Sequence, residues 1–214
     1  MTSRAGWALC ALVCIAAAPA RAQDAANPGG PLSLAPTGLT AETYQPITNR
    51  ERVDWIVFGT IGIRSLAIVG PLSAAWNTAW NTPEEWERTW SGFGKRYAQR
   101  EADVAISSTI EAGLGALWHE EPRYIRSGRK GIMPRARYAM KTVLLAQRKD
   151  GRLAPAWGRY AGNTLNNLIE NAWLPASVTT PGQTVARIGL GFASRLGGNL
   201  WEEFWPDVRA RLRK

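Results

Sequence analysis

Four side chains of this sequence are candidates for acid–base chemistry. His119 is the only histidine in the 214 residues, so any mechanism that needs an imidazole has to use it. Asp103, Glu111 and Glu121 lie near it along one predicted helix and its end, and with His119 they would give a hydrolase or transferase a general base and its partner. The alternative interpretation is that His119 only caps carbonyl groups at the end of that helix.

Glu111 is expected to be buried, because it lies between Ile110 and Ala112 on an apolar stripe. A buried carboxylate needs either a positively charged partner or a proton. We favour an arginine pair that fixes the register of two helices, with a proton-transfer site as the alternative. The candidate partners are the arginines flanked by apolar or small residues: Arg64, Arg159, Arg187 and Arg195.

The sequence predicts no metal and no cofactor. Tetrahedral zinc requires several Cys or His ligands, whereas this chain has one histidine, and its two cysteines, Cys10 and Cys14, both lie near the N-terminus. The run GFGKR at residues 92–96 does not have the spacing of a phosphate-binding loop.

The first 22 residues have the three parts of a secretory signal peptide: a positive start at Arg4, an apolar run over residues 7–18 and a small-residue cleavage site at Ala20-Arg21-Ala22. We therefore expect cleavage after Ala22 and a location in the periplasm or cell envelope. Residues 23–47 are rich in proline and glycine and predict a flexible lead. Residues 48–214 are long enough for a single all-helical domain.

A second set of residues predicts binding. The formal net charge is +9, and much of the excess lies between residues 123 and 159, where Asp150 is the only acidic residue. For an exported protein this favours an anionic membrane surface or envelope polymer, or a protein partner, and not nucleic acid. A solvated basic face that selects nothing is the alternative. The basic residues expected to bind are Arg123, Arg126, Arg129 and Lys130.

Trp76 and Trp80 stand in a short duplication, WNTAWNT, at the end of an apolar run. Core packing at helical spacing is the favoured interpretation of these tryptophans. The functional alternative is an aromatic platform for sugar rings or an anchor at a membrane interface, in which case both are ligand-binding residues.

One long helix is predicted at the centre of the fold, over residues 83–118. Thr82 can cap it, Pro83 suits its first turn, and no proline interrupts it before Pro122. Its apolar residues fall on two opposite faces, so neighbouring helices should cover most of its sides. The expected fold is therefore all-α, a single bundle of five or six helices around this long central helix.

Further helices are expected over residues 135–147, 154–173 and 180–196, with a break at Gly197-Gly198. The turn signal at Asp150-Gly151 joins two helices or closes a short hairpin, and we favour helices. Small residues recur at every fourth position, which predicts close helix crossings. These sets are Ser108, Ala112 and Ala116; Ala154, Gly158 and Gly162; and Gly189, Ala193 and Gly197.

Residues 55–76 are the most apolar run after the signal peptide, and a tryptophan stands at either end. A membrane-spanning helix is one interpretation. A helix packed on the bundle or lying in the membrane interface is favoured, because Arg64 lies in the middle of the run and Pro71 would weaken a continuous helix.

Three motifs follow one another along the chain: GFGKRY at residues 92–97, LWHEEPRY at 117–124 and EFWPD at 203–207. In these motifs, over residues 91–209, the chain resembles a family of uncharacterised exported bacterial proteins. Members of that family usually have a Gln-Asp pair where this chain has Glu120-Glu121, and Phe where it has Ile125. The resemblance implies that the three motifs belong to one architecture, and it implies no activity.

These patterns favour an exported, envelope-associated helical protein with a non-catalytic binding or structural role. Two alternatives stand beside it. One is a hydrolase or transferase that uses His119 with a buried carboxylate, and the other is an integral helical membrane protein.

Overall fold

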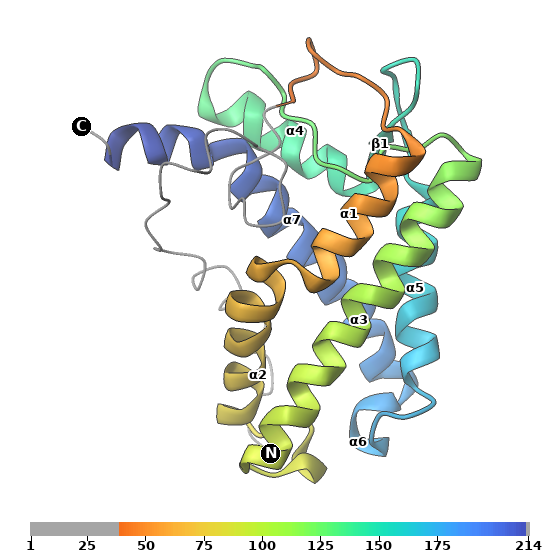
Figure 1. Cartoon of the computed structure of the whole chain (residues 1–214), viewed down its shortest axis with the longest axis vertical. Coiled ribbons are helices and arrows are strands. Elements are labelled where there is room, and N and C mark those ends of the chain that lie inside the picture. The colour runs from red at the N-terminus through yellow and green to blue at the C-terminus, as the bar shows by residue number, and fades with distance from the viewer. Residues whose placement is uncertain (1–38, 213–214) are drawn as a thin grey trace.

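The computed structural model describes residues 39–212, and most of them are helical (Figure 1). The predicted signal peptide and most of the predicted flexible lead lie outside the described residues. The all-α prediction is confirmed in this general form. The elements are α1 (Asn49–Ile61), a π-helical segment (Arg64–Val69), α2 (Gly70–Ala79), a 3₁₀ turn (Glu84–Trp86), α3 (Trp90–Leu117), α4 (Ile132–Leu144), β1 (Leu145–Gln147), β2 (Leu153–Pro155), α5 (Trp157–Glu170), α6 (Ala176–Thr179) and α7 (Pro181–Leu212).

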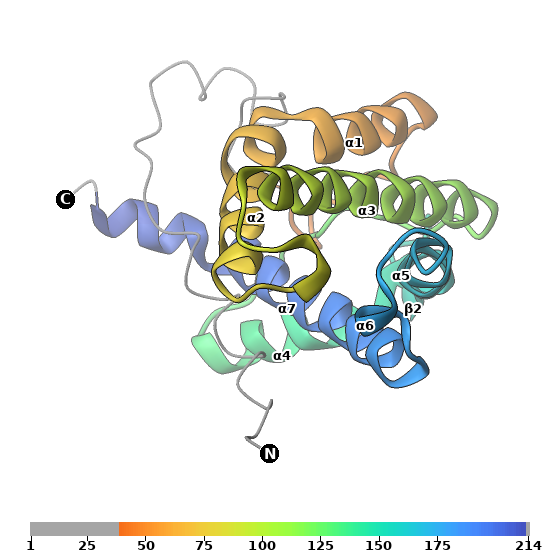
Figure 2. The ribbon, with the colours of Figure 1, turned by 90° about the horizontal axis from the view of Figure 1, so that it is seen from below.

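Helix α3 is the longest helix in the first half of the described chain, and it contacts α1, α2 and α5 (Figures 1 and 2). It begins at Trp90, where the Thr89 hydroxyl accepts a hydrogen bond from the Gly92 N–H. The predicted start at Pro83 is wrong. Thr89 caps the helix instead of Thr82 because the intervening residues form a 3₁₀ turn and a loop.

Arg96 holds that loop against the first turns of α3. Its guanidinium donates hydrogen bonds to the carbonyl oxygens of Thr82 (2.8 Å), Pro83 (2.7 Å) and Glu87 (2.7 Å). These carbonyls would otherwise lie unpaired at a buried surface, which costs about 1–3 kcal/mol for each group. The long-range contact of Arg96 therefore stabilises a loop where local sequence favours a helix.

Helix α1 begins with a capping box in which Thr48 and Glu51 satisfy each other's backbone N–H groups. The chain bends near Gly62 before it continues into the π-helical segment and α2, as Figure 1 shows. By length and composition, the stretch Asn49–Ala79 is one candidate membrane span within the described residues, and only 17% of its apolar window is buried by the protein itself. Its central arginine, Arg64, lies 3.9 Å from the carboxylate of Glu202 on α7.

The segment around Asp150-Gly151 is a β-hairpin, so the preference for helices there is wrong. Strands β1 and β2 pair antiparallel, with Leu145 opposite Pro155. Gly151 has a φ of +77°, which glycine adopts without steric cost. Helix α4 consequently ends at Leu144, earlier than predicted, because the following backbone groups pair across the hairpin.

Helix α7 is continuous through Gly197-Gly198, where a break was predicted. Two glycines inside a helix cost about 1 kcal/mol each. Contacts with α4 offset this cost, since the Asn199 side chain donates hydrogen bonds to the Ala139 carbonyl (3.1 Å) and to the Thr142 hydroxyl (3.3 Å).

Gly158 and Gly162 bring α5 close to α3, as predicted for the α5 set, but they meet α3 at Ser107, Glu111 and Gly115 and not at the predicted α3 set of Ser108, Ala112 and Ala116. A Cβ atom added at Gly158 would lie 2.7 Å from the Glu111 carbonyl oxygen, and one added at Gly162 would lie 2.8 Å from the Ser107 carbonyl oxygen. A Cβ atom at Gly189 in α7 would meet nothing within 4 Å, so that position makes no such crossing.

The interior of the described fold is unusually polar. Its fully buried hydrophobic residues are five alanines with Ile125, Tyr138 and Val143, whereas the largest fully buried side chains are Glu121, Glu203 and Asn166. Many large apolar side chains are exposed instead, on α1, α2, α4, α5 and α7. Water-soluble domains normally bury such residues, so this distribution bears directly on function.

Candidate functional site

A cleft of about 700 Å³ lies between α2, α3, α5 and α7, the four helices that surround this region in Figure 2. Helix α3 lines it with residues at every fourth position, which form one face of the helix. Helix α5 presents amides and a carboxylate from the opposite side. The charged side chains at the cleft are Arg96, Arg100, Asp103, Glu111, Arg159, Glu170, Arg187 and Arg195.

Glu111 is the centre of one charged cluster in this cleft. Its Oε1 atom lies 3.1 Å from Nε of Arg159 and 2.7 Å from Nη2 of Arg195. Arg159 also donates to the Thr142 carbonyl at 2.6 Å. Two of the four arginines proposed as partners of Glu111 therefore pair with it, and they tie α3 to both α5 and α7.

Asp103 and Glu170 form a second cluster, on α3 and α5. The amide of Asn166 donates a hydrogen bond to Asp103, and Arg187 on α7 lies 3.1 Å from Glu170. Burial and the neighbouring Asp103 carboxylate raise the pKa of Glu170 to about 7, and burial raises the pKa of Asp103. Oε1 of Glu170 and Oδ1 of Asn166 are buried without a hydrogen-bond partner among the described residues.

This second cluster can hold or transfer a proton. Arg187 pairs with Glu170, and the nearby Asp103 carboxylate adds a second negative charge, so protonation of one carboxyl group relieves the repulsion between the two.

The motif LWHEEPRY has a structural role in this fold. Glu120 accepts hydrogen bonds from the backbone N–H groups of Trp157 (2.9 Å) and Gly158 (2.8 Å), so it anchors the first turn of α5. Glu121 accepts from Nε of Arg123 at 2.8 Å and from the Ile47 N–H at 3.2 Å. Glu121, a predicted catalytic residue, is therefore committed to an ion pair outside the cleft of 700 Å³.

The motifs at residues 117–124 and 203–207 meet at Glu203, which is almost completely buried. Its carboxylate accepts hydrogen bonds from the Tyr124 hydroxyl (2.8 Å) and from the Ser127 N–H (3.0 Å) and hydroxyl (2.5 Å), and it pairs with Arg135 at 3.0 Å. Burial opposes ionisation, but these donors outweigh it and lower the pKa of Glu203.

His119 lies on the exposed surface at the end of α3, with a φ of +56°, and does not line the cleft. Of the four predicted catalytic residues, the fold therefore brings only Asp103 and Glu111 to one cleft. The His119 N–H donates to the Ala116 carbonyl (3.2 Å), but its imidazole has no hydrogen-bonding or charged partner among residues 39–212. An imidazole mechanism with the carboxylates of the cleft has no geometric support.

The predicted ligand-binding residues are divided between two ends of the molecule. Arg123 pairs with Glu121, and the backbone of Arg126 pairs with Leu39 and Ala41. Arg129 and Lys130 are exposed beyond them. Trp76 and Trp80 are exposed at the end of α2, with ring centroids 5.7 Å apart, so the favoured prediction of core packing is wrong for this pair.

Sequence reasoning missed Glu170 and Asn166. The signal that could have found them is a polar stripe on α5 at every third and fourth position, opposite a stripe of leucine and isoleucine. The polar residues of that stripe are Asn163, Asn166, Asn167 and Glu170.

Within residues 39–212, no group of three or more His, Cys, Asp or Glu side chains is placed to hold a metal ion. Comparisons with models of protein families, with curated proteins and with solved structures found no match.

Proposed function

We propose that this chain is an exported, non-catalytic protein that attaches to the cell envelope by inserting the apolar faces of α1 and α2 into one leaflet of a membrane. The observation that carries the proposal is a stripe of exposed apolar side chains along both helices. The stripe consists of Val53, Val57 and Ile61 on α1, Leu72 and Trp76 on α2, and Trp80 at the C-cap of α2.

The spacing of this membrane stripe supports the proposal. In each helix its residues are four positions apart, so they project from one face. Ile61 is 61% exposed and Trp80 is 55% exposed. Transfer of each half-exposed side chain from water into hydrocarbon is worth about 1 kcal/mol, so the stripe as a whole is worth several kcal/mol.

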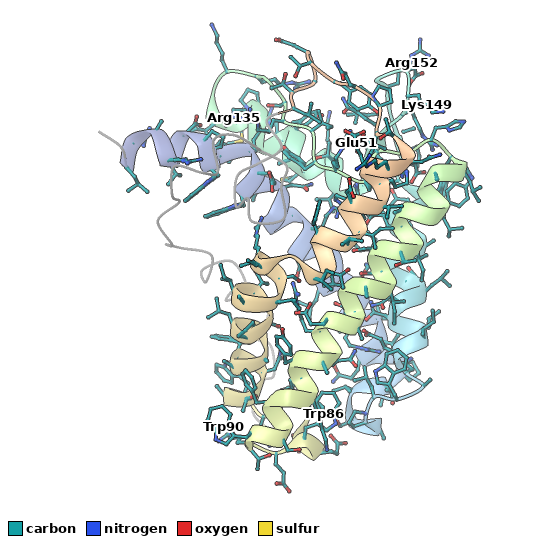
Figure 3. The ribbon with its side chains drawn as sticks, viewed as in Figure 1. Glu51, Trp86, Trp90, Arg135, Lys149 and Arg152 are labelled. Atoms are coloured by element: carbon teal, nitrogen blue, oxygen red, sulfur yellow. The ribbon has the colours of Figure 1, made fainter. Side chains whose placement is uncertain are left out.

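The two ends of the stripe also suit a membrane surface. Figure 3 shows Trp86 and Trp90 at the end of the molecule where α2 stops, and Lys149 and Arg152 at the opposite end, near the start of α1. Tryptophan favours the headgroup layer, and each basic residue near an anionic leaflet contributes about 1 kcal/mol.

Attachment to one leaflet fits the path of the chain better than a span. Helices α1 and α2 meet at a bend, and Arg64 at that bend faces Glu202 on α7. The pair fixes the bend against the rest of the protein, so the charged residue does not have to enter hydrocarbon. The resemblance to exported bacterial proteins and the predicted cleavage after Ala22 agree with a location in the envelope.

The test is flotation of the purified protein with vesicles of phosphatidylglycerol and phosphatidylcholine. The double variant Leu72→Ser, Trp76→Ser removes two of the three stripe residues contributed by α2 and its C-cap. The matched control is Leu165→Ser on α5 combined with Trp173→Ser in the turn after α5. It removes the same residue types at similar exposure, 42% and 46% against 45% and 38%. We expect the first variant to bind roughly thirtyfold more weakly, from about 2 kcal/mol of lost insertion, and the control to bind as wild type.

Equal losses in the two variants, or no loss in either, would refute attachment by the membrane stripe. Charge reversal at Arg129 and Lys130 should weaken binding to the anionic vesicles only. Resistance to extraction by alkaline carbonate would indicate a span and contradict attachment to one leaflet. Mass spectrometry of the exported protein checks cleavage after Ala22.

A further inference from the structure

The cluster around Glu111 has more positive than negative charge. Two guanidiniums, those of Arg159 and Arg195, approach one carboxylate oxygen. The nearby Glu121 does not compensate the second guanidinium, because it pairs with Arg123. The cluster therefore carries a net charge of +1 at the wall of the cleft. A guanidinium that is largely removed from water and lacks its own counter-ion is costly, and a bound anion would lower that cost.

Arg195 also has hydrogen-bonding capacity left over. Its Nη2 atom donates to Glu111 and to the Pro122 carbonyl (2.8 Å). Within the described chain, no acceptor pairs with its Nε or Nη1 atom, and its side chain is 27% exposed toward the cleft. Burial and the neighbouring Arg159 lower the pKa of Arg195 to about 10, so it stays charged at neutral pH.

Two hydroxyl groups add further donors to the lining of the cleft. Ser108 on α3 lies one turn before Glu111, and Ser194 on α7 precedes Arg195. Both line the cleft, and neither hydroxyl has a hydrogen-bond partner among residues 39–212. A guanidinium fork together with hydroxyl groups is a donor set that recognises phosphate oxygens.

We propose that the cleft binds a phosphate group, free or carried by a lipid headgroup, through Arg195, Ser194 and Ser108. The volume of about 700 Å³ exceeds that of inorganic phosphate and leaves room for an organic substituent. Asp103, which would repel an anion, lies two helical turns from Glu111, about 12 Å along α3. The phosphate site is thus at the Arg195 end of the cleft. It holds whether or not the membrane stripe enters a bilayer.

The experiment follows thermal unfolding of the detergent-solubilised full chain during titration. One arm uses inorganic phosphate against chloride at equal ionic strength, and a second arm uses phosphatidic acid against phosphatidylcholine in mixed micelles. We expect a saturable rise in the unfolding midpoint of several degrees. A response in both arms means that the free anion suffices, and a response to phosphatidic acid alone assigns the phosphate to a lipid.

Variants make the test specific. Arg195→Gln leaves Arg159 and Glu111 as a balanced pair, so we expect at least tenfold weaker phosphate binding. Ser194→Ala should weaken binding several-fold with little effect on folding, and it provides the test if the first variant does not fold. Glu111→Gln raises the net charge and should increase the stabilisation by phosphate. The control, Arg137→Gln, changes an exposed arginine on α4 outside the cleft and should bind as wild type.

No midpoint shift in either arm would overturn the proposal. It would also be overturned by equal phosphate responses in wild type, Arg195→Gln and Ser194→Ala. Flotation of these variants with vesicles separates the two proposals, because loss of the phosphate site leaves the membrane stripe intact.

Discussion

Replacement of Glu170 by glutamine should make the protein more stable at alkaline pH. The Glu170 carboxyl group is buried, and Asp103 adds a second negative charge, which together raise its pKa from 4.5 to about 7. The folded state therefore holds a proton that the unfolded state has already released over this interval. Stability should fall as pH rises from about 4.5 to about 7 and then level off.

The size of this effect follows from the two pKa values. Each unit between them is worth about 1.4 kcal/mol, which gives an upper figure of about 3 kcal/mol. Solvent in the adjoining cleft screens the charge, so about 2 kcal/mol is the expected loss. Glutamine keeps an acceptor for Arg187 and cannot ionise, so the variant should lose this part of the pH dependence.

Urea unfolding of wild type and Glu170→Gln between pH 4.5 and pH 8.5 measures the effect. From pH 4.5 to pH 8.5, the free energy of unfolding of the variant should rise by about 2 kcal/mol relative to that of wild type. Subtraction of the two curves cancels the titration of the other acidic groups, Asp103 excepted, since it couples to Glu170. The reasoning would be refuted if the difference between the two free energies of unfolding did not change with pH, or if wild type gained stability relative to the variant as pH rises.

Two further predictions concern buried positions. Glu203→Gln should be destabilised by about 2 kcal/mol at pH 7. The difference in the free energy of unfolding between wild type and this variant should narrow as pH falls below about 4.5, because burial opposes ionisation but the donors from Ser127, Tyr124 and Arg135 lower the pKa of Glu203 below that of the unfolded chain. Urea unfolding that shows a constant difference down to about pH 3 would contradict this. Gly158→Ala should lower the free energy of unfolding by about 1–3 kcal/mol, since its Cβ would meet backbone atoms of α3 within 3 Å. The control Gly189→Ala, whose Cβ would meet nothing within 4 Å, should be neutral or stabilised by up to about 1 kcal/mol. Equal shifts of the thermal midpoint in the two variants would show that α3 and α5 do not cross so closely.

Local patterns in the sequence determined several parts of this protein. The capping residues fixed the start of α1 at Thr48, because a cap depends on residues only three positions apart. The glycines of α5 at every fourth position indicated a close helix crossing. The apolar neighbours of Glu111 indicated a buried carboxylate, and the same reasoning reached its partners Arg159 and Arg195.

Other features depended on contacts between distant residues. The loop before α3 is stabilised by Arg96, which donates hydrogen bonds to the carbonyl groups of that loop. The hairpin after α4 forms because its two strands pair with each other, although the local sequence favoured helices there. Asp103 and Asn166 are 63 positions apart, and only the crossing of α3 and α5 brings them into one cluster. His119 stands near the carboxylates in sequence, yet it is exposed and does not line the cleft.

The sequence by itself therefore determined where most helices form, which faces are polar and which residues can approach closely, because these properties repeat over three or four positions. Only the tertiary structure decided which charges share a cleft and which apolar side chains stay uncovered, because both depend on the angles and distances at which whole helices pack. The phosphate site and the membrane stripe belong to this second kind of information.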